Sequence, residues 1–473
     1  MTGESMLTRV DRDRMRVVAA VTVLLLICAA HGQSARSIGM GGVVVPGRSA
    51  ASVNPAYAAV SDDGLTTLTL PLGVIGVASA VAELLSRDEP LDAVIPLYAA
   101  LGSPSTYLFG VPPGVLGARF DVTVRDDGVP IVRIGFAEDS AFDVGAASWR
   151  AARAVELPLR VPAGPVAVGV RPFLSSGVSL DLDRDLRAVF DAGTSRGTAR
   201  STLSAEAGVA IDVGYATRIP ADVLGFDEGA SEQRVYVGVR GGPFLGLAKA
   251  VGSATITVEA LLENGEPAYQ GSYAGDLFVS TVATDGVSFG ALFDVGFVIE
   301  TDLEGGTATL GAGITGVGFG VWRGNRYVLD GVELEEGRLP EPTPVTQTLF
   351  SSDFGVLLNG AYTSRLSPSI DLLVAGDVGY RAGRFLAHVG AEGTFHVGDA
   401  MRIAARAGVG IEDGLRLGVG TGIIASEVAL DVGLSLQRVP FTRQSAFGVS
   451  ASVGIPADAL RATEGALPTP PAP

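Results

Sequence analysis

The chain has 473 residues, enough for two or three soluble domains or for one large β-barrel with loops. Charged residues make up 18% of the sequence, below the roughly 25% of an average soluble domain, and glycine is unusually frequent with 64 residues. The net charge of −17 argues against a nucleic-acid partner, because phosphate contacts need clustered Lys and Arg. The single cysteine, Cys28, excludes disulfides and cysteine-ligated metal sites within one chain.

Residues 1–35 have the pattern of a secretory signal peptide. Four arginines precede an apolar run from Val17 to Ala30, and small residues follow this run. A membrane-anchor helix is one alternative, but the run is short for a membrane span. Lipidation at Cys28 is another, although Ile27 is an unfavourable neighbour for it. We therefore predict export through a cleaved signal peptide.

Residues 36–60 are rich in small residues and contain an Asn-Pro pair, which favours a compact segment without strands. The segment resembles the N-terminus of mature outer-membrane barrels of the FadL superfamily, most closely the largely uncharacterised TraF-like and PorV-like barrels. The residues that carry this resemblance are Gly39, Met40, Gly41, Gly42, Asn54, Pro55 and Ala56. The resemblance implies a plug inside a barrel, and an ordinary glycine-rich loop is the alternative.

Residues 61–163 mix strand and helix patterns. Leu65–Leu70 fits a first strand. The stretches 77–85 and 91–101 have helical spacing, so we expect a partly helical insertion near residues 77–112. We also expect a hairpin over Ala118–Val124 and Val129–Phe136, because a turn sequence separates two alternating runs.

From Gly164 to Ile455, apolar residues alternate with small or polar ones in runs of about ten residues. Successive side chains of a strand point to opposite faces, so this pattern predicts strands with one apolar face. The links at 381–383, 398–400 and 412–414 are short, which requires antiparallel neighbours. Strands of a soluble sandwich are usually shorter. We predict an all-β fold, a transmembrane antiparallel β-barrel of about 14 strands (range roughly 12–16) over residues 61–455, followed by a disordered Pro-rich tail over 456–473.

A second resemblance to the same family lies in Thr307–Leu334, where Gly318, Trp322, Asn325 and Tyr327 match a hairpin motif. Aromatic residues near the ends of the runs should mark the two membrane interfaces. The aromatic residues in such places are Tyr215, Tyr236, Phe278, Trp322, Phe350, Tyr362, Tyr380, Phe385 and Phe441.

The sequence lacks the common catalytic and cofactor-binding motifs. No P-loop, zincin motif or nucleophile elbow occurs in the sequence. His388, Glu392 and His396 share one face of a predicted strand, but strand residues four apart are separated by about 13 Å, too far for joint metal coordination. We therefore expect no enzyme activity and no cofactor.

The inward face of the last strands carries charges of both signs, which should form a ladder in the lumen. The members of this charge ladder are Arg384, His388, Glu392, Arg402, Arg406, Glu412, Arg416, Glu427 and Asp431. Mutual neutralisation that stiffens the barrel wall is the favoured role of the ladder, and anion selection is the alternative.

These features predict an outer-membrane protein of a diderm bacterium in contact with outer-membrane lipid. The FadL resemblance implies a channel for small hydrophobic or amphipathic molecules. A structural or accessory barrel that does not transport, as the TraF-like and PorV-like resemblance suggests, is the first alternative. A secreted soluble β-rich protein is the second.

Overall fold

The computed structural model describes the N-terminal segment and a large set of strands. The described residues are 34–60, 65–70, 72, 105–111, 118–124, 130–136, 148–156, 159–163, 166–182, 196–220, 233–263, 266–333, 341–398, 401–412, 414–425, 428–438 and 445–456. Almost all of the predicted signal peptide and tail lie outside these ranges, as do both stretches with helical spacing. None of the described helices is long and apolar enough to cross a membrane.

The helices of the described residues are short and lie mostly near the N-terminus. They are α2 (Ala35–Gly39), the 3-10 helices η1 (Arg48–Ser52) and η2 (Pro55–Ala59), and α6 (Val282–Asp285). Ser34 caps α2, because its hydroxyl accepts a hydrogen bond from the Ser37 amide at 3.2 Å. Asn54 caps η2 in the same way through the Ala56 amide at 3.0 Å, and Pro55 occupies the first helical position. The Asn-Pro pair therefore starts a turn, as its sequence predicts.

The strands fall into a first group of short strands and a second group of long ones. The first group is β1 (Leu65–Thr69), β2 (Thr106–Val111), β3 (Ala118–Val124), β4 (Pro130–Phe136), β5 (Ser148–Glu156) and β6 (Leu159–Ala163). The second begins with β7 (Val166–Leu182), β8 (Arg196–Ile219), β9 (Gln233–Glu263), β10 (Glu266–Thr281), β11 (Ser288–Leu303), β12 (Gly306–Glu333) and β13 (Thr343–Phe350). It ends with β14 (Gly355–Ser367), β15 (Ile370–Arg381), β16 (Arg384–Val397), β17 (Met401–Ile411), β18 (Leu415–Ala425), β19 (Val428–Arg438) and β20 (Ser445–Pro456).

Eighteen of these strands form one sheet, and β3 and β4 form a separate hairpin. At four places in the large sheet, two strands lie end to end and pair with successive parts of the same neighbouring strand, so the two together occupy one position in the strand order. These pairs are β1 and β2 along β20, β5 and β6 along β7, β10 and β11 along β9, and β13 and β14 along β12. The eighteen strands therefore occupy fourteen positions, the number predicted. From β14 to β20 each strand pairs antiparallel with the next, which confirms the predicted meander.

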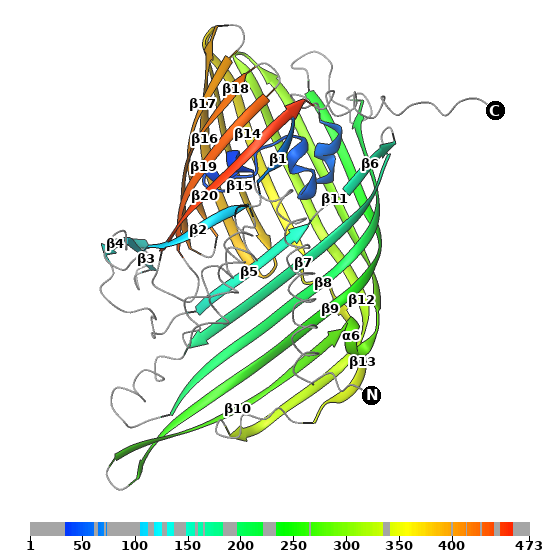
Figure 1. The fold of residues 1–473 in the computed structure, drawn as a ribbon, viewed down its shortest axis with the longest axis vertical. Coiled ribbons are helices and arrows are strands. Elements are labelled where there is room, and N and C mark those ends of the chain that lie inside the picture. Colours follow the sequence, from blue (N-terminus) through cyan, green and yellow to red (C-terminus); the bar gives the residue numbers. More distant parts are fainter. Residues whose placement is uncertain are drawn as a thin grey trace, which may run out of the picture.

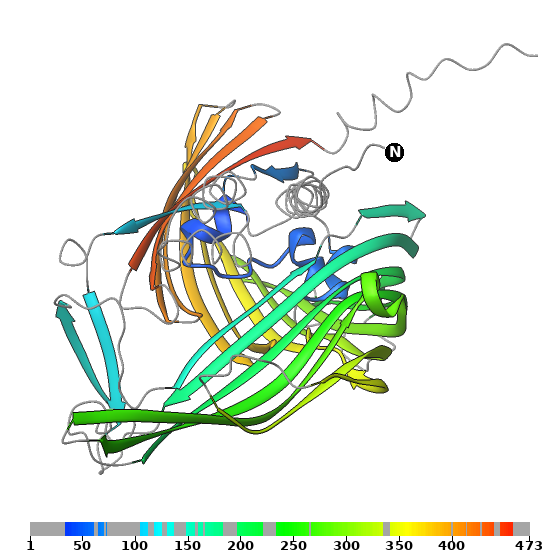
Figure 2. The same cartoon turned by 60° about the horizontal axis from the view of Figure 1, so that its bottom comes forward.

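The sheet curls around the N-terminal segment (Figures 1 and 2). Its two end positions are β1–β2 and β5–β6, and no ladder joins them within the described ranges. The all-β class is confirmed. The predicted hairpin over residues 118–136 is also confirmed, with its strands paired from Ala118–Phe136 to Val124–Pro130.

The outward face of the sheet is apolar, whereas the inward face is polar or small. On β16, Phe385 is 60% exposed and Val389 is 50% exposed, but His388 and Glu392 are each only 7% exposed. The same alternation of exposed and covered residues runs along β11, β15 and β18. This arrangement is the reverse of a soluble β-protein, whose apolar face is the covered one.

One sequence prediction about strand boundaries is wrong. The expected hairpin over Thr307–Leu334 is absent from the described part of that stretch, because β12 runs unbroken through Gly318, Trp322, Asn325 and Tyr327. Near the end of the predicted insertion, residues 106–111 form β2 and pair with β20, while both stretches with helical spacing lie outside the described residues.

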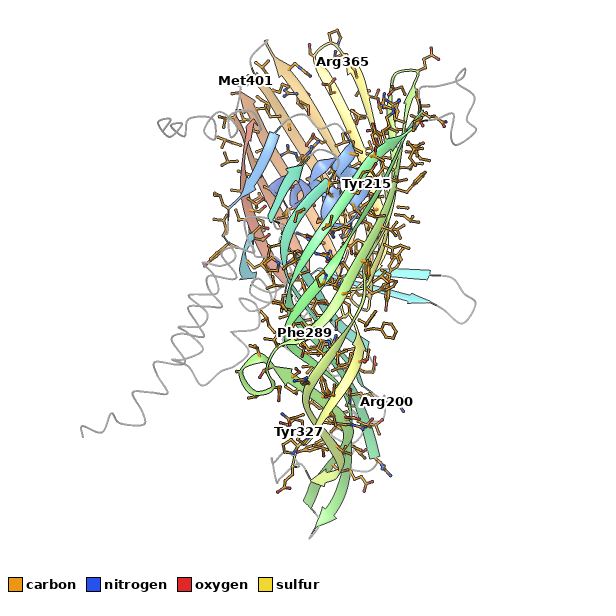
Figure 3. The ribbon with its side chains drawn as sticks, turned by 90° about the vertical axis from the view of Figure 1, so that its right-hand side faces the viewer. Arg200, Tyr215, Phe289, Tyr327, Arg365 and Met401 are labelled. Carbon is orange, nitrogen blue, oxygen red and sulfur yellow. The ribbon has the colours of Figure 1, made fainter. Side chains whose placement is uncertain are left out.

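Several strands continue past the others at one end of the sheet (Figure 1). We call this part the extension, and it is formed by β10, β13 and the adjoining parts of β8, β9 and β12. In Figure 3, Arg200 and Tyr327 lie in the extension, Arg365 and Met401 lie at the opposite end, and Tyr215 and Phe289 lie between.

Candidate functional site

Residues 34–60, which we call the plug, cross the interior of the curled sheet. α2 packs on β17, β18 and β19, and η2 packs on β8, β9 and β11, which lie on another side of the curl. Both views show these helices enclosed by the strands (Figures 1 and 2). The sequence motif residues of the plug are thus placed against two separate parts of the wall.

The first half of the motif lies against glycines of β16 to β19. Gly41 and Gly42 have φ values of 78° and 98°, which only glycine adopts at little cost, and they turn the chain beneath α2. Side chains added to the facing wall glycines would overlap plug atoms of residues 35–41, or at Gly420 would lie unusually close to Gly39. These wall glycines are Gly390, Gly408, Gly410, Gly418, Gly420 and Gly433. The wall therefore accepts the plug main chain at van der Waals distance because it lacks side chains there.

The second half of the motif also lies against wall residues that lack side chains. The wall residues that face Val53 to Tyr57 are Gly238, Gly296, Gly311 and Gly313. Asn54 also donates from Nδ2 to the Phe297 carbonyl at 3.0 Å. Tyr57 is fully buried and donates to Oδ1 of Asn359 at 3.0 Å. Burial raises the pKa of Tyr57, so its phenol stays protonated and remains a donor.

Charged and polar wall groups hold the first half of the plug. Arg36 forms a two-pronged ion pair with Glu392, at 2.9 and 2.7 Å. Glu392 also accepts from Arg406 at 2.5 Å, and Arg406 reaches Asp431 at 2.6 Å. This chain of alternating charges links the plug to β16, β17 and β19.

A second group of polar wall residues contacts the plug at Val44. The Val44 amide donates to Oδ2 of Asp377 at 2.6 Å, and Oδ1 of the same carboxylate lies 2.7 Å from Nδ1 of His388. Close to them, Glu412 pairs with Arg384 at 2.6 Å and with Arg416 at 3.5 Å.

The predicted charge ladder is therefore brought together in part. Six of its members pair with one another in two groups, Glu392–Arg406–Asp431 and Arg384–Glu412–Arg416, whereas His388 contacts Asp377, which is not a member. Arg402 forms no ion pair with another described residue, and Glu427 lies outside the described residues. His388 and His396 contact different carboxylates, since His396 lies 2.6 Å from Asp371. Within the described ranges no group of three or more His, Cys, Asp or Glu is placed to hold a metal ion.

The sequence reasoning missed a cluster of deeply buried charges on β7, β8, β9 and β11. Arg171 pairs with Asp294 at 3.0 Å and with Asp212 at 3.5 Å. Arg240 also pairs with both carboxylates, and it donates from Nη2 to the Ser52 carbonyl of the plug at 3.1 Å. These four side chains are at most 2% exposed. Alternation along the sequence places Arg171, Asp212 and Asp294 opposite the apolar face of their strands, but it does not show that they meet one another and Arg240.

Between this charge cluster and the extension, the interior is filled by an apolar core. It contains Phe173, Ala210, Phe244, Phe278, Leu292 and Trp322, and Val345 and Leu349 pack against it. Phe173 and Phe244 meet edge to face with ring centroids 5.5 Å apart. Strands β7 to β13 thus pack against one another across the interior here.

Phe278 and Trp322 of this core, together with Tyr236, which packs against the plug, correct the predicted aromatic belts. Tyr236, Phe278 and Trp322 face inward and are at most 5% exposed, so they mark no membrane interface. The outward aromatics are Tyr215, Phe350, Tyr362, Tyr380 and Phe385, while Phe441 lies outside the described residues. Of the predicted hairpin motif, Trp322 belongs to the core and Asn325 donates to Asp285 at 3.2 Å.

No protein-family model and no curated protein matches the chain. Among solved structures it is similar to the CymD monoaromatic hydrocarbon channel, with 11% identity, a TM-score of 0.35, and coverage of 90% of this chain and 98% of that chain. It is also similar to the toluene transporter TodX of P. putida, with 11% identity, a TM-score of 0.29 and coverage of 90% and 98%. A third similar structure is the translocator domain of autotransporter NalP from Neisseria meningitidis, with 9% identity, a TM-score of 0.18, and coverage of 65% of this chain and 86% of that chain. At TM-scores this low the likeness carries no argument about this chain.

Proposed function

We propose that the protein is an outer-membrane β-barrel, and that the plug opens and closes a path for small hydrophobic or amphipathic molecules. The outward face supports the membrane part of this proposal. Forty-four large apolar side chains are exposed among the described residues, whereas soluble monomers avoid large contiguous apolar patches. A strand of 11 residues such as β18 is about 36 Å long. A tilt of about 40° leaves close to 28 Å across the membrane, near the thickness of its hydrocarbon core.

The observation that supports a channel is the way in which the interior is filled at the level of the plug. Side chains alone can fill an eight-stranded barrel, but a barrel of fourteen positions encloses a wider space. Here the wall presents ten glycines, and the plug main chain occupies the space they leave. The plug belongs to no strand, so it can leave without breaking a ladder of the sheet.

A sealed accessory barrel is the second candidate, and the anchors of the plug favour it. Contacts from the plug reach wall residues on five different strands. The contacts are Arg36 to Glu392, Val44 to Asp377, Ser52 to Arg240, Asn54 to Phe297, and Tyr57 to Asn359. A plug that never leaves these anchors would seal the barrel permanently.

Locking the plug separates the two candidates. Val43 packs in one cluster with Ala375 of the wall, so a Val43→Cys, Ala375→Cys pair in a Cys28→Ser background can fasten the plug by oxidation. We expect uptake of a small hydrophobic dye into proteoliposomes when the pair is reduced and a loss of uptake when it is oxidised. Equal uptake in both states would contradict a moving plug, and absence of uptake in both would favour the sealed barrel. The Val43→Cys single variant is the control for oxidation.

Cell fractionation tests the location independently of transport. We expect the protein in the outer-membrane fraction, with heat-modifiable migration on gels, as folded barrels show. Recovery from a soluble periplasmic or secreted fraction would overturn the membrane proposal.

A further inference from the structure

The connection between β13 and β14, residues 351–354, folds into the interior and contacts strands that are not its neighbours in the sheet. Ser352 lies at the centre of these contacts. Its hydroxyl accepts from Lys249 of β9 at 2.9 Å and from Ser204 of β8 at 2.8 Å. Its amide donates to Glu206 of β8 at 2.6 Å, and its carbonyl accepts from Ser175 of β7 at 3.1 Å. We call residues 351–354 the inner loop.

Lys249 fastens the inner loop as a cation. Its ammonium donates to Glu206 at 2.7 Å, to the Phe350 carbonyl at 2.9 Å and to Ser352 at 2.9 Å, so all three N–H groups have acceptors. The aromatic ring of Trp322 adds a cation–π contact 5.7 Å from Nζ.

The inner loop also rests on a β-bulge of β12. Gly316 has φ of 65°, and a Cβ added there would overlap the Asp353 carbonyl. The Gly316 amide donates to Oδ1 of Asp294 at 2.7 Å. Asp294 pairs with Arg240, whose Nη2 reaches the Ser52 carbonyl of the plug at 3.1 Å. An unbroken series of direct contacts therefore connects Asp353 of the inner loop, through Gly316, Asp294 and Arg240, to Ser52 of the plug.

We propose that this path couples the position of the inner loop to the docking of the plug. Its charged members are almost fully buried, so any that loses a partner is left without compensation by water. Release of the loop frees the Gly316 bulge to shift Asp294, which weakens the hold of Arg240 on the plug. Phe350 is 85% exposed and Phe354 is 42% exposed at the two ends of the loop. A molecule that contacts these rings from outside could therefore act on the plug. This inference rests on the proposed function, because it requires a plug that moves.

Cysteine accessibility tests the coupling without any transport assay. Ala51 of the plug is 7% exposed, so Ala51→Cys in a Cys28→Ser background reacts with a maleimide mainly when the plug undocks. We call this variant the plug reporter. In the folded full-length protein we expect Lys249→Met to raise the labelling rate of the plug reporter about fivefold or more, the lower end of typical coupling strengths. Phe278→Leu loosens the same core without removing a hydrogen bond of the inner loop, and it should leave the rate within about twofold.

A double-mutant cycle locates the coupling on this path. In an Arg240→Met background, Lys249→Met should add less than about twofold to the labelling rate. Ser352→Ala is the milder substitute should Lys249→Met fail to fold. The inference is overturned when Lys249→Met or Ser352→Ala speeds labelling of a Phe354→Cys variant but leaves labelling of the plug reporter unchanged. If Gly390→Ala, which acts on the plug directly, also fails to change labelling of the plug reporter, then the moving plug itself is refuted along with the coupling.

Discussion

Gly390 and Gly393 lie on β16 but face opposite sides of the wall, and they form a matched pair for testing the seat of the plug. A Cβ added at Gly390 would overlap the Met40 carbonyl of the plug. A Cβ added at Gly393 would have Phe395 as its nearest neighbour, at 3.8 Å, which is ordinary contact. Gly390→Ala should therefore displace the plug, whereas Gly393→Ala should not.

The size of the effect follows from overpacking at Gly390. Replacing Gly by Ala within a strand stabilises the folded barrel by about 0.5–1 kcal/mol through chain entropy, but this gain is the same at both positions and in both states of the plug, so it does not change docking. Overpacking at Gly390 costs the docked plug about 1–3 kcal/mol, because the atoms that must move are main-chain atoms. A cost in the lower part of this range, about 1–2 kcal/mol, raises the undocked fraction about 5–30-fold.

Maleimide labelling of the plug reporter, Ala51→Cys with Cys28→Ser as background, measures this fraction. Heat-modifiable migration checks that both variants still form the barrel. We expect Gly390→Ala to label about 5–30-fold faster than the parent and Gly393→Ala to label at the parental rate. If both alanine variants label alike, the wall glycines are not a seat for the plug.

Three further predictions concern the plug, the outward face and a turn. Tyr57→Phe removes the bond to Asn359 and should raise labelling of the plug reporter in line with a cost of about 1–2 kcal/mol. Because burial raises the pKa of Tyr57, its contribution to docking is fully present below the ordinary tyrosine pKa and is lost as the pH rises through the higher pKa of the docked state. In that pH range the phenylalanine variant should label at a rate that does not depend on this titration. Phe293→Arg on the outward face should destabilise the barrel in lipid by about 2–4 kcal/mol in urea titrations, whereas Thr346→Arg in the extension should not. Ala382 has φ of 48°, so Ala382→Gly should stabilise the protein by about 1 kcal/mol in the same titration, and a loss of stability would contradict that reasoning.

The sequence was most informative where strands are regular. From Ile370 to Ile455 the alternation of apolar and polar residues determined both the strands and their inward face, because any slip of one residue would exchange the two faces. Short turns then left antiparallel pairing as the remaining choice, and the observed ladders follow it. The plug segment needed a resemblance as well, because its small residues have no periodicity of their own.

The sequence failed where a β-bulge changes which residues face inward. On β9, Lys249 has the same parity as Leu245 and Leu247, so strict alternation places it in the membrane. Leu247 is instead an extra residue in the ladder with β8, and beyond it Lys249 faces the interior, opposite Glu206. On β12, Gly316 does the same and turns Trp322 inward. A lysine at an otherwise apolar parity is the signal that would have revealed the first bulge.

The glycines of the wall imply that the plug and the barrel depend on each other for stability. Glycine in a strand costs about 0.5–1 kcal/mol relative to alanine, so ten such residues disfavour the bare wall by several kcal/mol. The absence of side chains at these glycines is favourable only when the plug covers them and restores van der Waals contact. Complete loss of the plug would therefore destabilise the very strands that form the path. A channel built in this way is expected to open by a shift of the whole plug within the barrel and not by its departure, and so a single oxidised cross-link such as the Val43→Cys, Ala375→Cys pair should stop passage.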